Sequence, residues 1–345
     1  MPFQVTIKPT DHSFSVNDGE SVLSAALREG YVLPYGCRNG ACGACKGKIL
    51  EGAVDYGNVQ PYVLAEFERK AGFALFCQAK PKTDLVIEAN EIKGVGQLEI
   101  RKMPCRVQEL KRVAEDVIVM KLKLPANERL QFLAGQYIDI LLKDGKRRSY
   151  SMGNAPHDDE HVELHVRNMN NGAFTEFVFN RMKERDILRF EGPLGTFFLR
   201  EDSDKPMIFV ASGTGFAPIK SIIEHAFHAG VKRPMTLYWG GRRPQDIYLG
   251  ELAGSWQETH ENFTFIPVIS EALAQDNWRG RSGFVHHAVM EDFPDLSAYQ
   301  VYACGAPIVV ESAHRDFTAQ CNLPDDAFFS DAFTPSVDPK PAAAG

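Results

Sequence analysis

Four cysteines near the N-terminus have the spacing of a metal–sulfur site. Cys37, Cys42 and Cys45 follow one another as C-x4-C-x2-C, and Cys77 comes after 31 further residues. This beginning with a distant fourth cysteine is the plant-type pattern that binds a [2Fe–2S] cluster. Cluster sulfurs concentrate negative charge that backbone N–H groups must stabilise, and glycines let the backbone close around them. The glycines at 36, 40, 43 and 47 provide that freedom, so we predict the four cysteines as metal ligands.

A zinc site is the alternative interpretation of these cysteines. Zinc sites more often use two C-x2-C pairs, and only one such pair is present. The total of 7 cysteines is odd, and the opening MPFQVTIKPT lacks the basic-then-apolar pattern of a signal peptide. We therefore expect a cytoplasmic protein in which cysteines serve metal or redox chemistry rather than a disulfide framework.

A second chemical signal is a glycine turn between a predicted strand and a predicted helix. Gly213, Thr214, Gly215 and Pro218 lie in the run GTGFAP. Glycines there let the backbone reach a pyrophosphate, and proline suits the first helical position. A tight turn without a ligand is the alternative. Pro218 stands where the dinucleotide fingerprint G-x-G-x-x-G has its last glycine, so that fingerprint is incomplete.

Three segments of different periodicity must position these groups. Residues 1–93 mix short strands and helices around the cysteine loop, which predicts a small α+β domain. Its expected elements are strands at 4–8, 13–16, 46–50 and 85–89, a helix from Ser21 and a helix at 62–70. Residues 91–97 have two glycines and no periodicity, which indicates a linker.

Residues 101–202 carry short strands separated by turns, which predicts an antiparallel barrel or sandwich. The strands are expected at 117–124, 137–142, 148–152, 162–166 and 186–191, with one helix at 173–182. Residues 203–335 alternate strands with helices, which predicts a doubly wound parallel sheet. The strands are expected at 207–211, 235–239, 263–269 and 300–304, and the helices at 218–229, 283–291 and 307–320. Residues 336–345 are expected to be a disordered tail.

Composition excludes several classes of protein. The 345 residues are 44% hydrophobic and 24% charged, which is ordinary for a globular protein and excludes a wholly disordered chain. No apolar run approaches the length needed for a membrane span. Residues 203–345 hold 10 Lys and Arg against 17 Asp and Glu, and no basic stripe occurs. We therefore expect neither nucleic acid nor an anionic membrane as a partner.

Several motifs in order resemble one known family. The runs YGCRNGACGACKGKI and LFCQA resemble the plant-type ferredoxin domain, and RSYS at 148–151 resembles the R-x-Y-[ST] motif of the ferredoxin–NADP reductase superfamily. HVR at 165–167, GAFT at 172–175 and GPLG at 192–195 resemble that superfamily's next motifs. The resemblance implies a β-grasp [2Fe–2S] domain, an antiparallel β-barrel FAD domain and a doubly wound NAD(P)H domain.

The resemblance also implies roles for individual residues. Arg148 would hold the flavin pyrophosphate, Tyr150 would pack on the isoalloxazine, and Ser151 would lie near flavin N5. The FAD site would further include His165, Val166, Gly172 and Thr175.

The superfamily's nucleotide turn is G-x-G-x-x-P, which matches residues 213–218 where the dehydrogenase fingerprint does not. In the C-G-x-P turn that follows, Cys304 would face the nicotinamide, beside Gly305. Asp331 and Phe333 resemble the acid-x-aromatic ending that lies over the flavin, although relatives often carry Glu and Tyr there. Ser151, Cys304 and Asp331 are thus the predicted catalytic residues.

The choice of nicotinamide cofactor depends on the loop after the third strand of the last domain. NADPH-preferring members commonly place Ser-Arg there, whereas this chain has Ser270 and Glu271. A glutamate would repel the 2′-phosphate, which favours NADH, although Arg242 and Arg243 offer positive charge nearby. FAD is favoured over FMN because FMN relatives usually carry the ferredoxin domain at the C-terminus.

The resemblance implies a reductase that passes electrons from NADH through FAD and a [2Fe–2S] cluster to a partner protein. The runs LYWGGRRPQDIY, VYACGAP and FFSDAF are most similar to reductases that serve CDP-sugar dehydrases. The reductase component of an aromatic or alkane oxygenase is the alternative within this family. A zinc-binding regulatory protein with a vestigial nucleotide fold is the alternative from another class.

Overall fold

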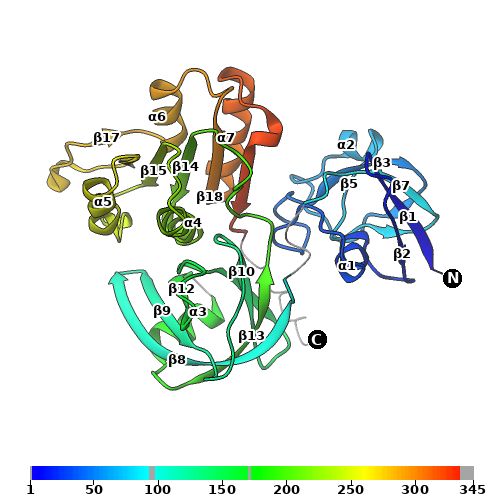
Figure 1. Cartoon of the computed structure of the whole chain (residues 1–345), viewed down its shortest axis with the longest axis horizontal. Helices are drawn as coiled ribbons and strands as arrows, with labels where there is room; N and C mark the ends of the chain where they lie inside the picture. The colour runs from blue at the N-terminus through cyan, green and yellow to red at the C-terminus, as the bar shows by residue number, and fades with distance from the viewer. Residues whose placement is uncertain (1, 93–97, 170–171, 335–345) are drawn as a thin grey trace, which may run out of the picture.

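Three large sheets formed by consecutive parts of the chain give the computed structural model its three domains, and a two-stranded sheet of β4 and β6 adds to the first (Figure 1). The structure describes residues 2–92, 98–169 and 172–334. The predicted tail at 336–345 and most of the predicted linker lie outside the described residues. The predicted fold class is confirmed in all three parts.

The first domain is a five-stranded sheet covered by a short helix. The strand order is β2-β1-β7-β3-β5. Its elements are β1 (Phe3–Lys8), β2 (Ser13–Val16), α1 (Val22–Arg28), β3 (Lys46–Glu51), β4 (Val54–Asp55), α2 (Glu66–Lys70), β5 (Phe73–Leu75), β6 (Lys80–Pro81) and β7 (Leu85–Glu88). Ser21 caps α1 by accepting a hydrogen bond from the Ser24 amide at 3.2 Å, as expected for a serine before an apolar run.

Helix α2 is shorter than the predicted 62–70. Residues 61–64 turn instead, and the helix begins after Ala65, whose amide donates to the Glu68 carboxylate at 2.8 Å. The apolar core of this domain also continues into the second domain. Tyr137, Leu194 and Phe198 of the second domain pack in the same buried cluster as the residues of the first.

The second domain is a six-stranded antiparallel barrel with strand order β11-β10-β13-β8-β9-β12. Its elements are β8 (Arg101–Ala114), β9 (Val117–Lys123), β10 (Tyr137–Leu141), β11 (Arg147–Ser151), β12 (His161–Arg167), α3 (Ala173–Asn180) and β13 (Ile187–Leu194). A bridge between Met152 and Leu164 joins the two edges of the sheet. Strand β8 was not among the predicted strands, because proline and five basic residues interrupt its alternating pattern.

The third domain is a parallel sheet with helices on both faces and strand order β17-β16-β15-β14-β18-β19. Its elements are β14 (Met207–Ser212), α4 (Phe216–His228), β15 (Met235–Gly241), α5 (Gly250–Thr259), β16 (Phe263–Ile269), β17 (Arg281–Ser282), α6 (Val285–Asp292), β18 (Gln300–Gly305), α7 (Pro307–Gln320) and β19 (Phe328–Ala332). Helices α4 and α5 pack on one face, and α6 and α7 on the other.

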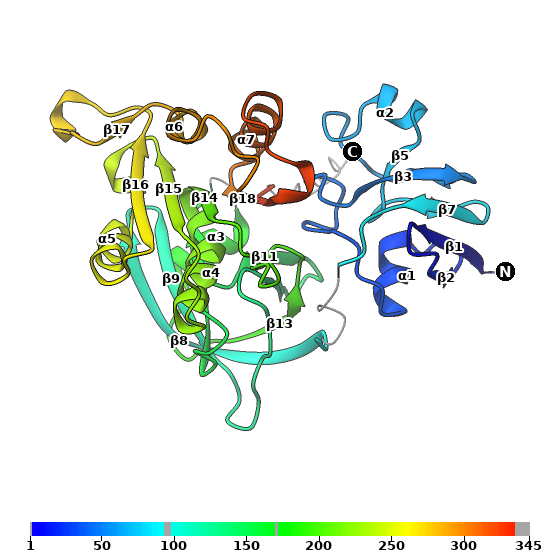
Figure 2. The same ribbon diagram turned by 45° about the horizontal axis from the view of Figure 1, so that its top comes forward.

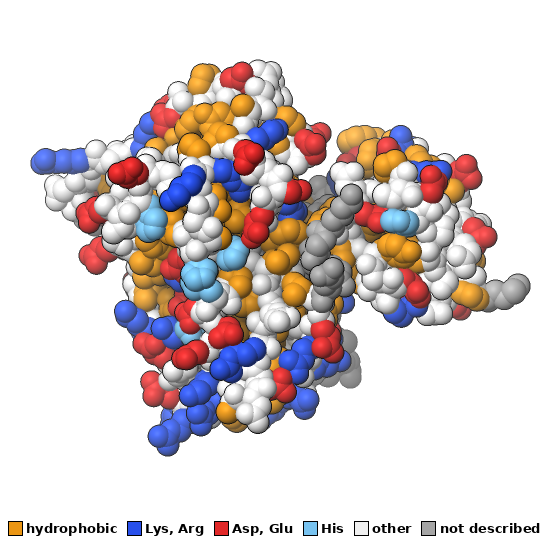
Figure 3. Space-filling model, in the orientation of Figure 1, with side chains coloured by type: hydrophobic (Ala, Val, Ile, Leu, Met, Phe, Trp, Pro, Cys, Tyr) orange, Lys and Arg blue, Asp and Glu red, His pale blue; other side chains and the backbone are white. Residues whose placement is uncertain are grey.

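The first domain lies beside the other two, and β19 reaches the edge that faces it (Figures 1 and 2). On the face shown in Figure 3, acidic and basic side chains are interspersed over the barrel and the third domain. Among the described residues, no helix combines the length and apolarity that crossing a bilayer requires.

Candidate functional site

The four predicted ligand cysteines meet at one edge of the first domain. Cys37 and Cys42 are partly exposed in the loop after α1, whereas Cys45 and Cys77 are buried. The thiols interact in two pairs, Cys37 with Cys42 and Cys45 with Cys77. Within each pair the neighbouring thiol lowers the pKa of one cysteine and raises the pKa of its partner: the pKa falls for Cys77 and, to about 6, for Cys37, and it rises for Cys42 and Cys45.

The backbone around these sulfurs fits a cluster with negative charge. The amide of Cys37 donates to the Cys42 Sγ at 3.3 Å, and the amide of Ala41 donates to the Cys37 Sγ at 3.4 Å. Gly40 has a φ of +81°, and a Cβ atom there would lie 2.6 Å from the Asn58 carbonyl oxygen. Four converging thiols with amide donors therefore suit a [2Fe–2S] cluster, for which these residues would be the ligands.

The predicted flavin motif lies on β11, at the end of the barrel that faces the cysteine loop. Arg148 and Tyr150 are partly buried, and Ser151 is buried where the strand ends. The Tyr150 ring lies 5.8 Å from Phe174 in the first turn of α3. The structure thus brings the R-x-Y-S strand together with the start of the helix that was predicted to bind phosphate.

Helix α3 begins after Gly172 without a side-chain cap. Uncapped N–H groups at a helix start are suited to a diphosphate. The hydroxyl of Thr175 donates back to the Gly172 carbonyl at 2.9 Å, so this side chain shapes the turn. Val166 is fully buried in the barrel core, so its side chain packs inside the barrel rather than against a cofactor.

The glycine turn at Gly213 and Gly215 joins β14 to α4, as predicted. A Cβ atom at Gly215 would lie 2.1 Å from the Cys304 carbonyl oxygen, so this position requires glycine for close backbone approach. The Ser212 hydroxyl accepts a hydrogen bond from the Ala306 amide at 2.8 Å. The predicted pyrophosphate turn and the predicted nicotinamide turn are therefore one packed unit.

Cys304 is fully buried at the end of β18, and burial raises the pKa of its thiol well above the ordinary value. This thiol therefore stays protonated and is not poised as a nucleophile. Phe333 is tied to the same turn, because its amide donates to the Gly305 carbonyl at 2.8 Å.

Asp331 on β19 reaches the cysteine loop. Its carboxylate lies 3.4 Å from the position of a Cβ atom at Gly36. Burial and the negative charge of Cys37 raise the pKa of Asp331 to about 7, and a hydrogen bond with Ser151 opposes that rise. The structure therefore places Asp331 between the flavin motif and the cysteine loop.

The loop that was predicted to select the nicotinamide cofactor contains an internal ion pair. Arg243 binds Asp276 through two hydrogen bonds of 2.8 and 2.6 Å. The Glu271 amide donates to the Arg242 carbonyl at 2.8 Å, which holds Glu271 in the same loop. One of the two arginines that could have attracted a 2′-phosphate is thus neutralised by an aspartate.

Sequence reasoning missed a buried polar network that joins the barrel to the third domain. Lys220 on α4 donates to the Gly153 carbonyl at 3.0 Å and to the Glu224 carboxylate at 2.9 Å, and lies 3.1 Å from the Glu163 carboxylate. Glu163 accepts from His165 Nε2 at 3.0 Å, and the opposite ring nitrogen of His165 accepts from the Tyr248 hydroxyl at 2.8 Å.

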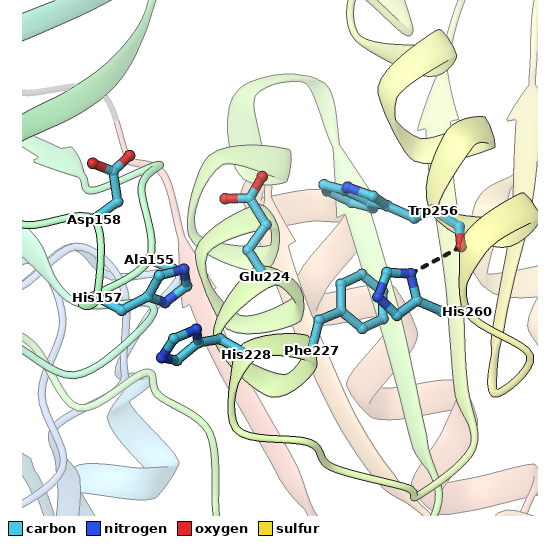
Figure 4. Close-up of a pocket in the computed structure, with 8 residues that line it drawn as sticks. All are labelled: Ala155, His157, Asp158, Glu224, Phe227, His228, Trp256 and His260. Atoms are coloured by element: carbon cyan, nitrogen blue, oxygen red, sulfur yellow. Dashed lines mark hydrogen bonds between the residues drawn. The ribbon is translucent and has the colours of Figure 1, made fainter.

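Both ring nitrogens of His165, a predicted FAD residue, are thus engaged by protein partners. Burial lowers the pKa of His165, so the imidazole is neutral at physiological pH. The network ends at a pocket of about 520 Å³ between the barrel and helices α4 and α5 (Figure 4). Residues from all three elements line it, including His157, Glu224, His228 and Trp256, and none of the lining residues belongs to the predicted motifs.

Arg167 ends the HVR motif at 165–167 but was not predicted as a site residue. Its guanidinium lies 2.5 Å from the position of a Cβ atom at Gly213, and its Nε lies 2.9 Å from the Asp116 carboxylate. A fixed positive charge therefore stands over the predicted pyrophosphate turn. The sequence signal for Arg167 was a basic residue directly after the apolar Val166, at the end of the strand that became β12.

Comparison with protein families gives three successive matches. Residues 5–82 match the 2Fe-2S iron-sulfur cluster binding domain, residues 104–199 the oxidoreductase FAD-binding domain, and residues 209–315 the oxidoreductase NAD-binding domain. These matches support a [2Fe–2S] cluster, FAD and a nicotinamide cofactor, in the order of the three sheets.

Individual relatives match over nearly the whole chain. CDP-6-deoxy-L-threo-D-glycero-4-hexulose-3-dehydrase reductase of Yersinia pseudotuberculosis is 39% identical over 97% of this chain and 100% of its own. Reductase component 1 of the terephthalate 1,2-dioxygenase of a Comamonas species is 35% identical over 97% of this chain and 98% of its own. The crystal structure of the Amycolatopsis reductase GcoB superposes with a TM-score of 0.78, at 32% identity, and covers 97% of this chain and 100% of its own.

Proposed function

Since the chain belongs to the ferredoxin reductase family of NAD(P)H oxidoreductases, we propose that it carries electrons from NADH to a CDP-sugar 3-dehydrase. The observation that carries the electron path is the contact between domains. Tyr137 of the barrel bonds to Gly36 beside a cluster ligand, and Asp331 of the third domain lies at the same point. FAD held in the barrel would supply the conversion of a two-electron hydride from the nicotinamide into single electrons for the cluster.

The chain's own residues position these groups. We assign the domains to residues 1–93, 101–202 and 203–335. We assign binding of the flavin to Arg148, Tyr150 and Ser151, with the start of α3 at Gly172 for its diphosphate. Thr175 shapes that turn, and Val166 supports the site from within the barrel core.

In the third domain we assign the nucleotide pyrophosphate to the turn from Gly213 to Pro218, with Thr214 in its centre. Gly305 and the buried Cys304 form the wall beside the nicotinamide, and Phe333 is held at that wall through its amide. Asp331, with its pKa raised to about 7, is positioned to hold a proton near Ser151.

NADH is the proposed electron donor. Glu271 places a negative charge in the loop where a 2′-phosphate would need a positive one, and Asp276 neutralises Arg243. Both features disfavour NADPH because like charges repel and a paired guanidinium has few donors left.

The first test is the visible absorption spectrum of the purified protein under anaerobic conditions. We expect overlapping flavin and [2Fe–2S] bands that NADH bleaches. A colourless protein, or a protein that holds zinc at the cysteines, would refute the proposed electron path.

The CDP-sugar dehydrase is proposed as the acceptor because the dehydrase reductase of Yersinia pseudotuberculosis is 39% identical over nearly the full length. An oxygenase component is the second candidate, because the terephthalate dioxygenase reductase is 35% identical over a similar span. Reconstitution distinguishes them: the reduced protein should support turnover of a purified CDP-sugar 3-dehydrase. Turnover of a purified oxygenase and none of the dehydrase would establish the second candidate.

A further inference from the structure

One peptide group connects the flavin barrel to the sulfur of a cluster ligand. The hydroxyl of Tyr137 donates to the Gly36 carbonyl oxygen at 2.7 Å. The nitrogen of the same peptide belongs to Cys37, and its N–H donates to the Cys42 Sγ at 3.3 Å. A continuous hydrogen-bonded chain therefore runs from the Tyr137 hydroxyl in the barrel, through the Gly36–Cys37 peptide, to the Cys42 Sγ in the cysteine loop.

Hydrogen bonds in series polarise one another. A donor to a peptide oxygen increases the positive charge on the peptide N–H, which strengthens the bond that this N–H gives. Hydrogen bonds to cluster sulfurs are among the features that set the reduction potential of an iron–sulfur cluster. They favour the reduced state, because that state carries one more negative charge at the sulfurs.

We propose that Tyr137 is a positioning residue that raises the reduction potential of the [2Fe–2S] cluster through the Gly36–Cys37 peptide. This inference rests on the proposed function, since it requires a cluster at the four cysteines. It goes further in assigning the barrel a part in tuning the electron acceptor, in addition to holding the flavin.

The surroundings of Tyr137 are built for this contact. Its side chain is 5% exposed, and burial keeps the pKa of its hydroxyl well above the ordinary value, so the hydroxyl stays a donor. Gly195 has a φ of +93°, and a Cβ atom there would lie 2.8 Å from the Tyr137 ring. The last glycine of the G-P-x-G motif thereby leaves room for this ring.

The pairing of Tyr137 within the barrel also fixes the direction of its side chain. It opens strand β10, where it pairs in register with Ser151 on β11 and with Leu194 on β13. Two neighbouring strands therefore hold the backbone of Tyr137, and one of them ends at the predicted flavin residue.

A second barrel hydroxyl contacts the same segment and provides a matched control. Thr196 Oγ1 accepts from the Tyr35 amide and donates to the Tyr35 carbonyl, both at 3.0 Å. These bonds hold the domains together without involving the Gly36–Cys37 peptide. Loss of the Thr196 hydroxyl thus tests domain contact alone.

The experiment is a redox titration of the holoprotein, with the electron paramagnetic resonance signal of the reduced cluster as the readout. Tyr137→Phe should make the potential more negative, because it removes the hydroxyl and retains the ring. A change of roughly 10–30% in one charge-assisted hydrogen bond corresponds to about a 1.3- to 4.6-fold shift in the one-electron equilibrium. At about 59 mV per tenfold, this is about 7–39 mV. Thr196→Val should leave the potential unchanged.

Replacement of Tyr137 by 3-fluorotyrosine provides a variant of nearly the same size. Its hydroxyl is a stronger donor, so the potential should move in the positive direction, even if Tyr137→Phe does not fold. Hydrogen exchange of the Cys37 amide provides an independent readout on the chain itself, and it should become faster in Tyr137→Phe than in Thr196→Val.

Two outcomes would overturn the inference while leaving the proposed function intact. One is an unchanged potential in cluster-bearing Tyr137 variants, and the other is an equal shift in the Thr196→Val protein, which would assign the effect to domain contact. A wild-type protein without the signal of a reduced cluster would instead overturn the proposed function together with this inference.

Discussion

The buried lysine between the barrel and the third domain allows a quantitative prediction about stability. Lys220→Met keeps the aliphatic side chain and removes an ammonium group that is within 3.1 Å of three acceptors. The side chains of Lys220 and Glu163 are only 10% and 11% exposed. Breaking such a pair leaves a buried carboxylate without its partner, which costs about 3–5 kcal/mol.

Urea unfolding followed by tryptophan fluorescence measures this cost. All 3 tryptophans lie in the third domain, so the signal reports the domain that contains α4. Glu163→Gln combined with Lys220→Met should recover part of the loss, because the double variant no longer buries the Glu163 charge. The partly exposed pair of Arg101 and Glu128 is the matched control, and Glu128→Gln should cost under about 1 kcal/mol.

The ion pair of Lys220 and Glu163 also determines how the folding stability depends on pH. Burial alone would raise the pKa of Glu163, but the hydrogen bond from His165 and the charge of Lys220 lower it overall. Burial alone would lower the pKa of Lys220, but the carboxylates of Glu163 and Glu224 raise it overall. The stability from Glu163 is therefore lost only in acid, below its ordinary pKa, and that from Lys220 only in alkali, above its ordinary pKa.

The contribution of the pair in the wild type should accordingly be constant between about pH 5 and pH 8. In Lys220→Met the two carboxylates lack the ammonium, so their pKa values rise, and stability should fall as pH increases over that interval. A loss below about 1 kcal/mol, or a variant with unchanged pH dependence, would refute the reasoning.

Three further predictions concern the electron path. Cys42→Ser should abolish cytochrome c reduction, because it removes a cluster ligand, while NADH–ferricyanide activity through the flavin persists; loss of both activities with FAD still bound would contradict the assigned order. Glu271→Arg should increase the preference for NADPH over NADH by about tenfold, since it replaces repulsion with attraction, and an unaltered ratio of the two kcat/KM values would remove the 2′-phosphate argument. Gly215→Ala should raise the KM for NADH roughly tenfold, because its Cβ would overlap the Cys304 carbonyl, whereas an unaltered KM would show that this turn does not bind the nucleotide.

Local sequence signals were sufficient for much of the fold. The strand at 263–269 and the helix at 307–320 have the predicted bounds, because an apolar run with clear flanking turns defines each of them. Helix α5 was missed because it contains Gly250 and Gly254, which weaken any helical pattern. Strand β19 was missed because its sequence FFSDAF was interpreted only as a motif.

The candidate site likewise has one part that local sequence patterns predicted and another part that they did not. The cysteine loop is a local pattern, and its spacing alone predicted four ligands that the fold brings together. The bond from Tyr137 to Gly36 joins residues 101 positions apart, and that from Lys220 to Gly153 joins residues 67 positions apart. Neither residue type is unusual at its position, so only the folded chain shows that they meet.

The shared core of the first two domains limits how this reductase can be rebuilt by recombination. Tyr137, Leu194 and Phe198 pack in the same apolar cluster as the cysteine-bearing domain. A ferredoxin module cut out at the linker would leave behind three of the side chains that cover its core. A chimera that exchanges this module with another reductase should therefore carry those three barrel residues with it, so that the natural unit of exchange extends past the domain boundary.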